Sequence, residues 1–525
     1  MPHRHLRKRA RARGGIEERF ADALEHHRAG RLERAAAGYE QVLHDRPEHA
    51  PALSMIGVLA LQRGTPERAV PPLLRATVLD PEQPGYFLNL GNALRGTERL
   101  GEAEQAYRKA LQLEPGMAIA HNNLGNVLRD RGLLHEAALA YREALRLSPE
   151  LFAAAANLAQ VLARLDDTPR QEVLVAHERA LAIAERAGLR TTDVANALNA
   201  RAGLLLAAGE DEAAVACLRE AIAIDPSFVE AHLNLAHAHA RALRLELAVE
   251  PLRAAIALRP DELGPYRRLA MVLRRLQRND EAHEVYQAWH ARDPDDPIAA
   301  HMANVGDADP PERASDDYLT REFDGFAESF ESVLLDELDY QGPRLVAAAL
   351  QRTGLAERRG MEVLDAGCGT GLCAGLLRPL AARLTGVDLS GKMLAKARAR
   401  GSYDALVEAE LGAFLLAHPH RFDLVVAGGV LLYFGRLDEL ARALGGALRP
   451  GGGVVLTVEA GHDAERGWSL SDSGRYAHHP SYLRRVLHDA GLRQVEMIED
   501  QLHLELGEPV MAWVVTATRP APRGG

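Results

Sequence analysis

Residues 365–371 read Asp-Ala-Gly-Cys-Gly-Thr-Gly and follow a short apolar run that starts at Glu362. The run is typical of a buried strand. The glycines after it predict a tight turn whose backbone approaches a ligand closely, because glycine has no Cβ. A dinucleotide-binding turn would need a further glycine at position 372, where the chain has Leu372. The spacing therefore disfavours a nicotinamide enzyme.

Around this turn, short apolar runs alternate with helical patterns from about residue 343 onward. Such alternation is typical of a mostly parallel sheet with helices on both faces. The last two runs leave no room for a helix, so they predict an antiparallel hairpin that turns near Gly507. The seven expected strands are Glu362–Ala366, Arg383–Asp388, Leu406–Glu410, Leu424–Ala427, Val454–Val458, Val495–Asp500 and Met511–Thr516.

The chain upstream of this region repeats itself every 34 residues. The period is marked by two series of prolines, which are Pro47, Pro81, Pro115 and Pro149, and then Pro226, Pro260 and Pro294. In the segment that ends at Pro149, Gly125 and Ala137 are small enough for two helices to approach closely, and Tyr141 fills the space between neighbouring pairs. We count eight segments in residues 16–296; the fifth, 152–194, has nine extra residues, which predict a longer second helix or loop at 165–193.

These segments resemble the tetratricopeptide repeat in period and at its signature positions. The order of motifs in residues 317–518 resembles that of class I S-adenosylmethionine-dependent methyltransferases. As a whole, the chain resembles the bacterial predicted methyltransferases that join such repeats to such a domain. The fold that this resemblance implies is multidomain: an N-terminal all-α tetratricopeptide solenoid, then a C-terminal α/β Rossmann-like seven-strand methyltransferase domain.

The same resemblance implies S-adenosyl-L-methionine as the cofactor. In such domains, the glycine-rich turn and Asp365 hold the ammonium group of the cofactor, and Asp388 accepts hydrogen bonds from both ribose hydroxyls. Glu410 stands where an Asp usually accepts a hydrogen bond from the adenine amino group. The expected cofactor-binding residues are Asp365, Gly367, Cys368, Gly369, Gly371, Asp388, Leu389 and Glu410. We expect no metal site, because Cys368 and Cys373 are too few for thiolate ligation.

The side of the site that receives the methyl group is less well specified. Relatives often carry Asp where this chain has Gly429, so the site is either adapted to another acceptor or weakened. Tyr433 and His478 are the expected catalytic residues, because an oxygen or nitrogen acceptor needs a base. For each candidate histidine, a structural role is the more common alternative. Further candidates for the base are His462, Tyr476 and His479, and Arg475 is a candidate clamp for an anionic substrate.

An asparagine precedes the signature Leu at the sixth position of four repeats. These residues are Asn89, Asn123, Asn157 and Asn234. In superhelical arrays of this family, that position faces the concave groove, where amide side chains can hydrogen-bond the backbone of an extended peptide. The alternative is that the asparagines only tie adjacent helices together. The resemblance leaves both readings open, and the first makes the four asparagines the expected partner-binding residues.

We expect four segments: a basic disordered tail at 1–15, the solenoid at 16–296, a polar linker at 297–316 and the methyltransferase domain at 317–520. A contact with nucleic acid or with a membrane surface is the alternative for the tail. The aromatic residues that follow the linker, from Tyr318 to Phe330, are interpreted either as a lid over the cofactor or as a helix packed on the sheet.

Composition narrows the function further. The net charge of -11 argues against a nucleic-acid partner. The sequence contains no run of 18 apolar residues, so we expect no membrane span. Three cysteines in 525 residues favour a reducing, cytoplasmic location. The expected function is methyl transfer to an unidentified acceptor, with a repeat array that recruits a protein or peptide. The alternative is an interaction scaffold with a cofactor-binding but catalytically weak domain; a repeat-bearing glycosyltransferase is disfavoured by the size of the second domain.

Overall fold

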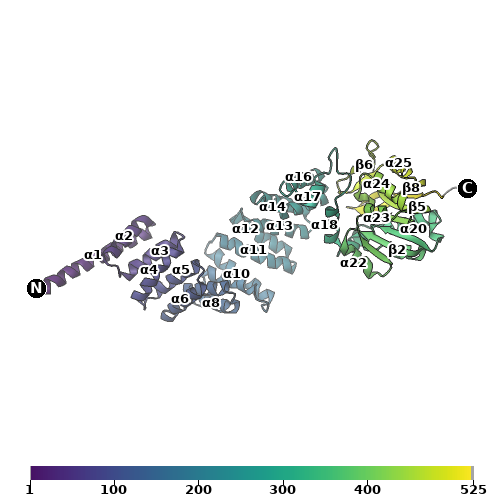
Figure 1. Ribbon diagram of the computed structural model, residues 1–525. Coiled ribbons are helices and arrows are strands. Elements are labelled where there is room, and N and C mark those ends of the chain that lie inside the picture. Colours follow the sequence, from purple (N-terminus) through teal and green to yellow (C-terminus); the bar gives the residue numbers. More distant parts are fainter. Residues whose placement is uncertain (1, 522–525) are drawn as a thin grey trace. The chain divides into compact units, whose positions relative to one another are not determined.

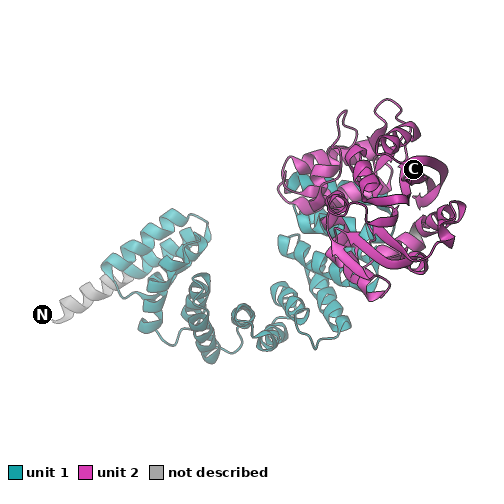
Figure 2. Ribbon diagram, turned by 45° about the vertical axis from the view of Figure 1, so that its right-hand side comes forward, with its two compact units in different colours: residues 1–258 teal, residues 259–525 magenta. Residues whose placement is uncertain are grey.

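The computed structural model describes residues 2–521, with side chains from Gly15 onward except at position 337. The chain forms two compact units, residues 1–258 and residues 259–525 (Figures 1 and 2). No helix within the described residues is both long and apolar enough to cross a bilayer.

Unit 1 consists of antiparallel helix pairs, as the 34-residue period predicts (Figure 1). Its helices are α1 (Pro2–Arg28), α2 (Leu32–Asp45), α3 (Ala50–Gln62), α4 (Pro66–Leu79), α5 (Pro84–Gly96), α6 (Leu100–Leu113), α7 (Ala118–Asp130), α8 (Leu134–Leu147), α9 (Phe152–Leu162), α10 (Arg170–Arg186), α11 (Thr192–Ala208), α12 (Asp211–Ile224), α13 (Val229–Arg241) and α14 (Leu245–Leu258). The fifth pair has both features expected of it, because α10 is 17 residues long and follows a longer loop at 163–169.

Close contact within a pair depends on the small signature residues. A Cβ on Gly125 would lie 2.5 Å from the ring of Tyr141, and one on Gly91 would lie 2.6 Å from the ring of Tyr107. Both tyrosines are fully buried or nearly so. The glycines are therefore required by the packing of helix on helix, as the sequence predicts.

Two expectations at the ends of the array differ from the structure. Helix α1 begins at Pro2 and so includes the stretch expected to be a disordered tail at 1–15; Arg, Lys, Leu and Ala, which dominate there, all favour helix. The eighth predicted repeat belongs to unit 2, where it forms α15 (Leu263–Arg275) and α16 (Asn279–His290).

The stretch at 297–316, which the sequence predicts to be a linker, is also packed into unit 2. It contains α17 (Pro297–Met302), whose N-terminus is capped by the buried Asp296. The carbonyl oxygen of Pro311 accepts a hydrogen bond from the hydroxyl of Tyr476 at 2.8 Å, and the amide of Ala314 donates to the carbonyl of Tyr433 at 2.9 Å. Its prolines and polar residues thus mark a tight loop over the second domain.

The rest of unit 2 is one nine-stranded sheet with helices on both faces (Figure 1). The strands are β1 (Met361–Ala366), β2 (Ala381–Asp388), β3 (Ala405–Glu408), β4 (Phe422–Gly428), β5 (Leu448–Ala460), β6 (Trp468–Leu470), β7 (Tyr476–His478), β8 (Arg493–Glu505) and β9 (Glu508–Thr518). The helices are α18 (Asp316–Phe326), α19 (Phe330–Ser332), η1 (Val333–Glu337), α20 (Gly342–Arg352), η2 (Leu355–Glu357), α21 (Ala374–Leu377), η3 (Arg378–Leu380), α22 (Gly391–Ala399), α23 (Leu411–Leu416), η4 (Leu431–Tyr433), α24 (Asp438–Ala447) and α25 (Pro480–Asp489).

The sheet confirms the Rossmann-like expectation. Strands run in the order β3-β2-β1-β4-β5, all parallel, and β9 then pairs antiparallel with β5 and with β8. The seven strands expected from the sequence are all present, and β8–β9 is the expected hairpin. The chain adds β6 and β7, which pair antiparallel with each other and extend the end of β5.

Alternating residues of the central strands explain why helices cover both faces. On one face, Val455 and Val514 belong to the core that α20 completes through Leu345. On the other face, Leu456 and Val515 lie against apolar residues of α24 and α25. Because side chains alternate along a strand, this sheet buries both faces and places its loops at the strand ends.

Candidate functional site

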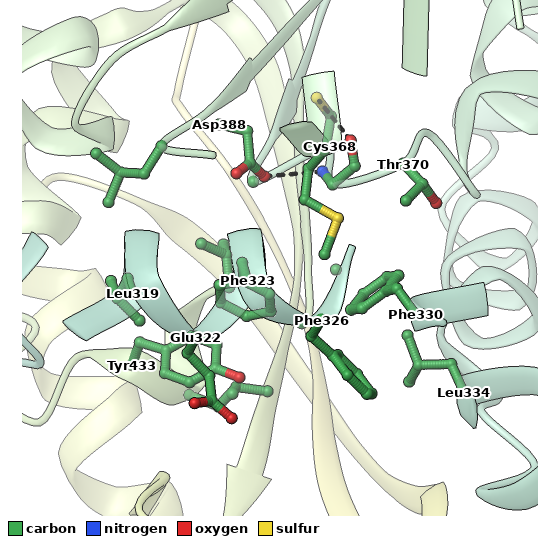
Figure 3. A pocket seen from close by; sticks show the side chains of 18 of the residues that line it. Leu319, Glu322, Phe323, Phe326, Phe330, Leu334, Cys368, Thr370, Asp388 and Tyr433 are labelled. Atoms are coloured by element: carbon green, nitrogen blue, oxygen red, sulfur yellow. Dashed lines mark hydrogen bonds between the residues drawn. The ribbon is translucent and has the colours of Figure 1, made fainter. Parts of the chain in front are cut away.

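A cavity of about 330 Å³ opens at the carboxyl ends of β1, β2 and β4 in unit 2 (Figure 3). This edge is where open parallel sheets bind their ligands, at the point where strand order reverses. Strand β1 pairs with β2 on one side and with β4 on the other. The glycine-rich turn after β1 therefore lies at the point where strand order reverses.

Asp365 ends β1 and is nearly fully buried beneath this turn. Its Oδ2 accepts a hydrogen bond from the hydroxyl of Tyr403 at 2.6 Å. Burial raises the pKa of Asp365 to about 6, and the hydrogen bond from Tyr403 opposes this increase. A carboxylate without a cationic partner at the floor of a cavity is suited to a ligand that carries an ammonium group.

The three glycines of the turn have positive φ angles, but they serve different purposes. A Cβ on Gly367 would lie 2.5 Å from the side chain of Val430, and one on Gly371 would lie 3.0 Å from the ring of Tyr403. Only Gly369 leaves open space: its nearest neighbour would be the ring of Phe330, 4.0 Å away. Bare backbone therefore faces the cavity at Gly369, whereas the other two glycines accommodate protein side chains.

Asp388 ends β2, the strand next to β1, and lines the same cavity (Figure 3). Its Oδ2 accepts a hydrogen bond from the amide of Gly369 at 2.8 Å, and its Oδ1 accepts one from the amide of Ser390 at 2.9 Å. Burial raises the pKa of this carboxyl above its usual value. The amide of Leu389 also donates to this carboxylate, so three of its roughly four acceptor sites are used and acceptor capacity remains for a ligand in the cavity.

Glu410 also lines the cavity, but its carboxylate already has partners. It caps the N-terminus of α23, where its two oxygens accept hydrogen bonds from the amides of Gly412 and Ala413 at 2.9 and 2.6 Å. The guanidinium of Arg313 donates to the same carboxylate at 3.1 Å. These contacts make Glu410 chiefly a helix cap, so an adenine contact through its side chain is the least supported of the expected cofactor contacts.

The aromatic segment covers the cavity. Phe323, Phe326 and Phe330 point into it from α18 and α19 (Figure 3). Polar contacts attach the segment to α22 on the opposite side: the hydroxyl of Ser390 donates to Asp324 at 2.5 Å, and Lys396 pairs with Glu328 at 3.2 Å. Of the two interpretations left open by the sequence, the cover over the cavity is the one these contacts support.

The expected catalytic residues are separated by the structure. Tyr433 lines the cavity, and burial raises the pKa of its hydroxyl, which is therefore protonated near neutral pH. His478 lies in β7, is 0% exposed and uses its Nε2 in a contact with the carbonyl of Gly435 at 2.9 Å. Burial lowers the pKa of His478 to about 4. The three-residue strand β7 buries this side chain away from the cavity, so the structure does not support the prediction of His478 as a base.

The remaining base candidates also lie outside the cavity. Tyr476 is fully buried and donates to Pro311, His479 caps α25, and His462 is exposed on the loop after β5. Arg475, by contrast, does line the cavity.

Arg274, Tyr340 and His503 are among the cavity residues that the sequence did not indicate. Tyr340 bears on the unusual Gly429, because a Cβ at position 429 would lie 2.7 Å from the hydroxyl of Tyr340. A polar group from a different element therefore occupies the place where relatives often carry a side chain. Only the coincidence of an unusual Gly429 with an upstream tyrosine signals this, and the two are 89 residues apart in sequence.

Comparison with known proteins agrees with this geometry. The family model of a methyltransferase domain matches residues 338–497. Tetratricopeptide-repeat models match residues 20–84, 88–152, 204–242 and 233–297. The protein joins tetratricopeptide repeats to a methyltransferase domain.

The methyltransferase domain is similar to curated enzymes over part of their length. It is 34% identical to the malonyl-[acyl-carrier protein] O-methyltransferase of Pseudescherichia vulneris over 25% of this chain and 53% of that protein. It is 38% identical to the trans-aconitate 2-methyltransferase of Paracidovorax citrulli over 19% of this chain and 38% of that protein. The chain thus spans about half the length, or less, of these relatives.

The repeats are similar to a solved tetratricopeptide-repeat structure, YrrB, described as having an unusual peptide-binding site. The identity is 26%, the match covers 36% of this chain and 94% of that chain, and the TM-score is 0.31.

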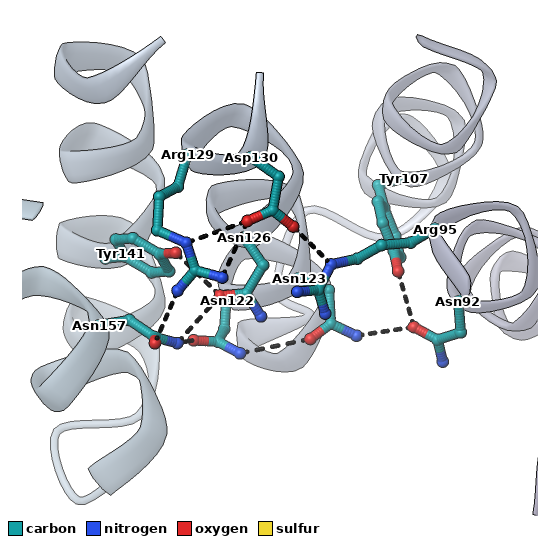
Figure 4. A network of polar contacts seen from close by, with 10 residues as sticks. All are labelled: Asn92, Arg95, Tyr107, Asn122, Asn123, Asn126, Arg129, Asp130, Tyr141 and Asn157. Atoms are coloured by element: carbon teal, nitrogen blue, oxygen red, sulfur yellow. Dashed lines mark hydrogen bonds and ion pairs between the residues drawn. The ribbon is translucent and has the colours of Figure 1, made fainter. Parts of the chain in front are cut away.

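In unit 1, a groove of about 800 Å³ lies over the first helices of the third and fourth repeats. It is lined by Asn92, Asn123 and charged residues that include Arg95 and Asp130, which form an ion pair at 3.0 Å across the repeats (Figure 4). Of the four expected asparagines, Asn123 therefore lines this polar groove.

Each of the four asparagines also donates a hydrogen bond to the preceding repeat. Asn123 donates to Asn92 at 2.9 Å, and Asn157 donates to Asn122 at 3.1 Å (Figure 4). Asn234 donates to Asn199 at 2.9 Å, and Asn89 contacts Ser54 at 3.4 Å. The structure therefore contains the ties between helices that the sequence left as an alternative to peptide binding.

Proposed function

We propose that this protein is an S-adenosylmethionine-dependent methyltransferase. The observation that carries the proposal is the opening of the cavity onto bare backbone at Gly369, with the carboxyls of Asp365 and Asp388 at the ends of neighbouring strands beside it. A Cβ at position 369 would project into that space. The residues present thus fit a ligand with an ammonium group at one end and vicinal hydroxyls nearby.

Asp365 would hold the ammonium group, Asp388 would accept hydrogen bonds from the ribose, and the phenylalanines of α18 and α19 would exclude water. The bound cofactor would supply an activated methyl group on a sulfonium, whose departure requires no acid. The contribution of the protein is then mainly alignment, which is worth up to about 7–11 kcal/mol in favourable cases.

Tyr433 has a different role in this proposal from the one expected of it. A hydroxyl whose pKa is raised by burial is a poor base, but it is a good hydrogen-bond donor. We therefore assign Tyr433 to orientation of the acceptor. Removal of a proton, where the acceptor needs it, is not assigned to any side chain.

The proposal is tested with Gly369→Ala and a matched control, Gly375→Ala. Gly375 lies in α21 with nothing within 4 Å of an added Cβ, whereas Gly369 has a φ of +53° and faces the cavity. We expect Gly369→Ala to weaken binding of S-adenosylhomocysteine at least tenfold in calorimetry, because the methyl group both strains the turn and occupies the cavity. Gly375→Ala should bind like the parent.

Equal binding by the two variants, or no binding by the parent, would refute the cofactor assignment. Calorimetry does not separate an enzyme from a scaffold that only binds cofactor. Release of S-adenosylhomocysteine from the methyl donor, measured with fractionated lysate as the source of acceptor, separates them.

We also propose that the repeat array recruits a protein or peptide, which is either the acceptor or its carrier. The polar groove at Asn92 and Asn123 supports this, because it presents amide and charged groups from two successive repeats.

A further inference from the structure

Two guanidinium groups line the same end of the methyltransferase cavity. Arg475 precedes β7, and Arg274 comes from α15, the first helix of the last repeat. The loop between β6 and β7 joins them: the guanidinium of Arg274 donates to the carbonyl of Ser473 at 3.3 Å. A second contact fixes the same loop to the repeat, since Asn279 donates to Asp472 at 2.6 Å.

The counter-ions of both arginines lie behind this wall. Nε of Arg475 donates to Glu459 at 2.8 Å, and its Nη2 donates to Glu505. The Nη2 of Arg274 lies 3.9 Å from the other oxygen of Glu505. Neither carboxylate lines the cavity, although both arginines do. Both arginines therefore reach the cavity wall, whereas their carboxylate partners do not.

This arrangement has the chemistry of an anion site. Guanidinium groups present several N–H donors in a plane and suit carboxylate or phosphate oxygens. The two ion pairs to Arg475 leave both N–H groups of its Nη1 unused. The carboxylates behind the wall fix the side chains in place, so little conformational entropy is lost when an anion binds.

The other ionisable groups at this end do not change that polarity. Glu322 lines the cavity from α18, but it is exposed to solvent. His503 is buried and lies 3.9 Å from Glu505. Arg274 and Arg475 therefore add cationic donors to a wall on which Glu322 is hydrated; the other carboxylates that line the cavity, Asp365, Asp388 and Glu410, are the expected cofactor contacts.

We propose that Arg274 and Arg475 together bind an anionic group of the methyl acceptor, so that the last repeat is part of the acceptor site. The proposal rests on the proposed methyltransferase function and adds a substrate class to it. A carboxylate and a phosphate monoester share this chemistry, and the experiment distinguishes them.

The test uses the full chain loaded with S-adenosylhomocysteine. Binding of hexanoate, hexanamide and hexyl phosphate is measured by calorimetry for the parent, Arg274→Gln, Arg274→Lys and Arg275→Gln. Arg275 is the matched control, because it is the next residue on the same helix, carries the same charge and is exposed.

We expect the parent to bind hexanoate or hexyl phosphate at least tenfold more tightly than hexanamide. Arg274→Gln should lose about tenfold of that affinity, Arg274→Lys should retain part of it, and Arg275→Gln should match the parent. Affinity for S-adenosylhomocysteine should be the same in all four proteins. The tighter of the two anions identifies the group as carboxylate or phosphate.

Similar affinities for the anions and the amide would overturn the proposal, as would parental affinity in Arg274→Gln or no binding of either anion. Failure of the parent to bind S-adenosylhomocysteine would instead refute the proposed function, on which this inference depends.

Discussion

Asp365 carries the most informative electrostatics of the cavity. It is 3% exposed, and it accepts a hydrogen bond from the neutral hydroxyl of Tyr403. Burial therefore disfavours its charged form and raises its pKa from 3.8 to about 6. In the unfolded chain, the same carboxyl returns to its ordinary pKa.

This difference predicts how stability depends on pH. Between pH 4 and pH 6, the folded protein holds a proton on Asp365 that the unfolded chain has released, so the free energy of unfolding falls as pH rises through this range. The loss is on the order of 3 kcal/mol and is complete above pH 6. Asp365→Asn removes this loss, since its side-chain oxygen still accepts the hydrogen bond from Tyr403.

Urea unfolding of parent and variant between pH 4 and pH 8 measures the effect. Tryptophan fluorescence reports unit 2 alone, because Trp289, Trp468 and Trp513 all lie there. The variant should gain stability relative to the parent up to pH 6 and keep a constant advantage above it. Parallel curves for the two proteins would contradict the shifted pKa.

The sequence locates the residues at strand ends better than the others. Asp365 and Asp388 end short apolar runs, and the parallel sheet brings such strand ends to one edge, so their proximity is predictable. His478 was misplaced because β7 is only three residues long, too short for a period to be visible. Arg274 was missed because its helix has a repeat pattern, which gives no sign of a contact with a distant loop.

At the scale of elements, periodicity predicts the helix pairs well because each repeat imposes the same packing. The contact of Gly125 with Tyr141 recurs between Gly91 and Tyr107, so the packing of one helix pair predicts the packing of the next. The asparagines are harder to interpret from sequence. A half-buried amide at a groove serves a neighbouring helix or a ligand equally well, and only the geometry shows that the neighbouring helix is bonded.

Asn89→Ala combined with Asn123→Ala should therefore destabilise unit 1. The double variant loses two hydrogen bonds between repeats, each worth about 0.5–1.5 kcal/mol. Hydrogen exchange of the amides in α5 and α7 should become faster, and Gln105→Ala, a substitution of an exposed amide on α6, should leave exchange unchanged. Unchanged exchange in the double variant would argue that the asparagines do not tie the helices.

The same variant tests the groove if binding is measured well below its unfolding temperature. Weaker capture of partners by a protein that is still folded supports a direct contact with the amides. Capture equal to that of the parent limits the asparagines to a structural role.

At the scale of the whole chain, the sequence identifies the two kinds of domain but not where one ends. The repeat pattern continues to Pro294, and residues 297–316 have the composition of a linker. In the structure, α15, α16 and α17 all pack within unit 2: His301 contacts the carbonyl of Gly474 at 2.8 Å, and Met302 fills the space beside that glycine. The amino-acid composition of a segment indicates its local flexibility, whereas a domain boundary depends on contacts between segments that are distant in sequence.

Fragments that begin at Arg259 and at Pro297 distinguish the two boundaries. The shorter fragment lacks α15, α16 and Asp296, which caps α17 and pairs with Arg321 at 2.9 Å. It also exposes the loop at 471–475, which loses its contacts with Arg274 and Asn279. The fragment from Pro297 loses several hydrogen bonds, an ion pair and the apolar surface that packs around Tyr286. We therefore expect its free energy of unfolding to be lower than that of the fragment from Arg259 by on the order of 3–5 kcal/mol.

Urea unfolding followed through Trp468 and Trp513, which both fragments retain, measures this difference. The fragment from Arg259 should unfold at the same urea concentration as the corresponding transition of the full chain and should bind S-adenosylhomocysteine as tightly. The fragment from Pro297 should unfold at clearly lower urea. If the two fragments unfold together, the last repeat is only appended to the methyltransferase domain. If only the fragment from Arg259 is stable, the helix pair α15–α16, which has the sequence of a repeat, is required for the stability of the methyltransferase domain that follows it.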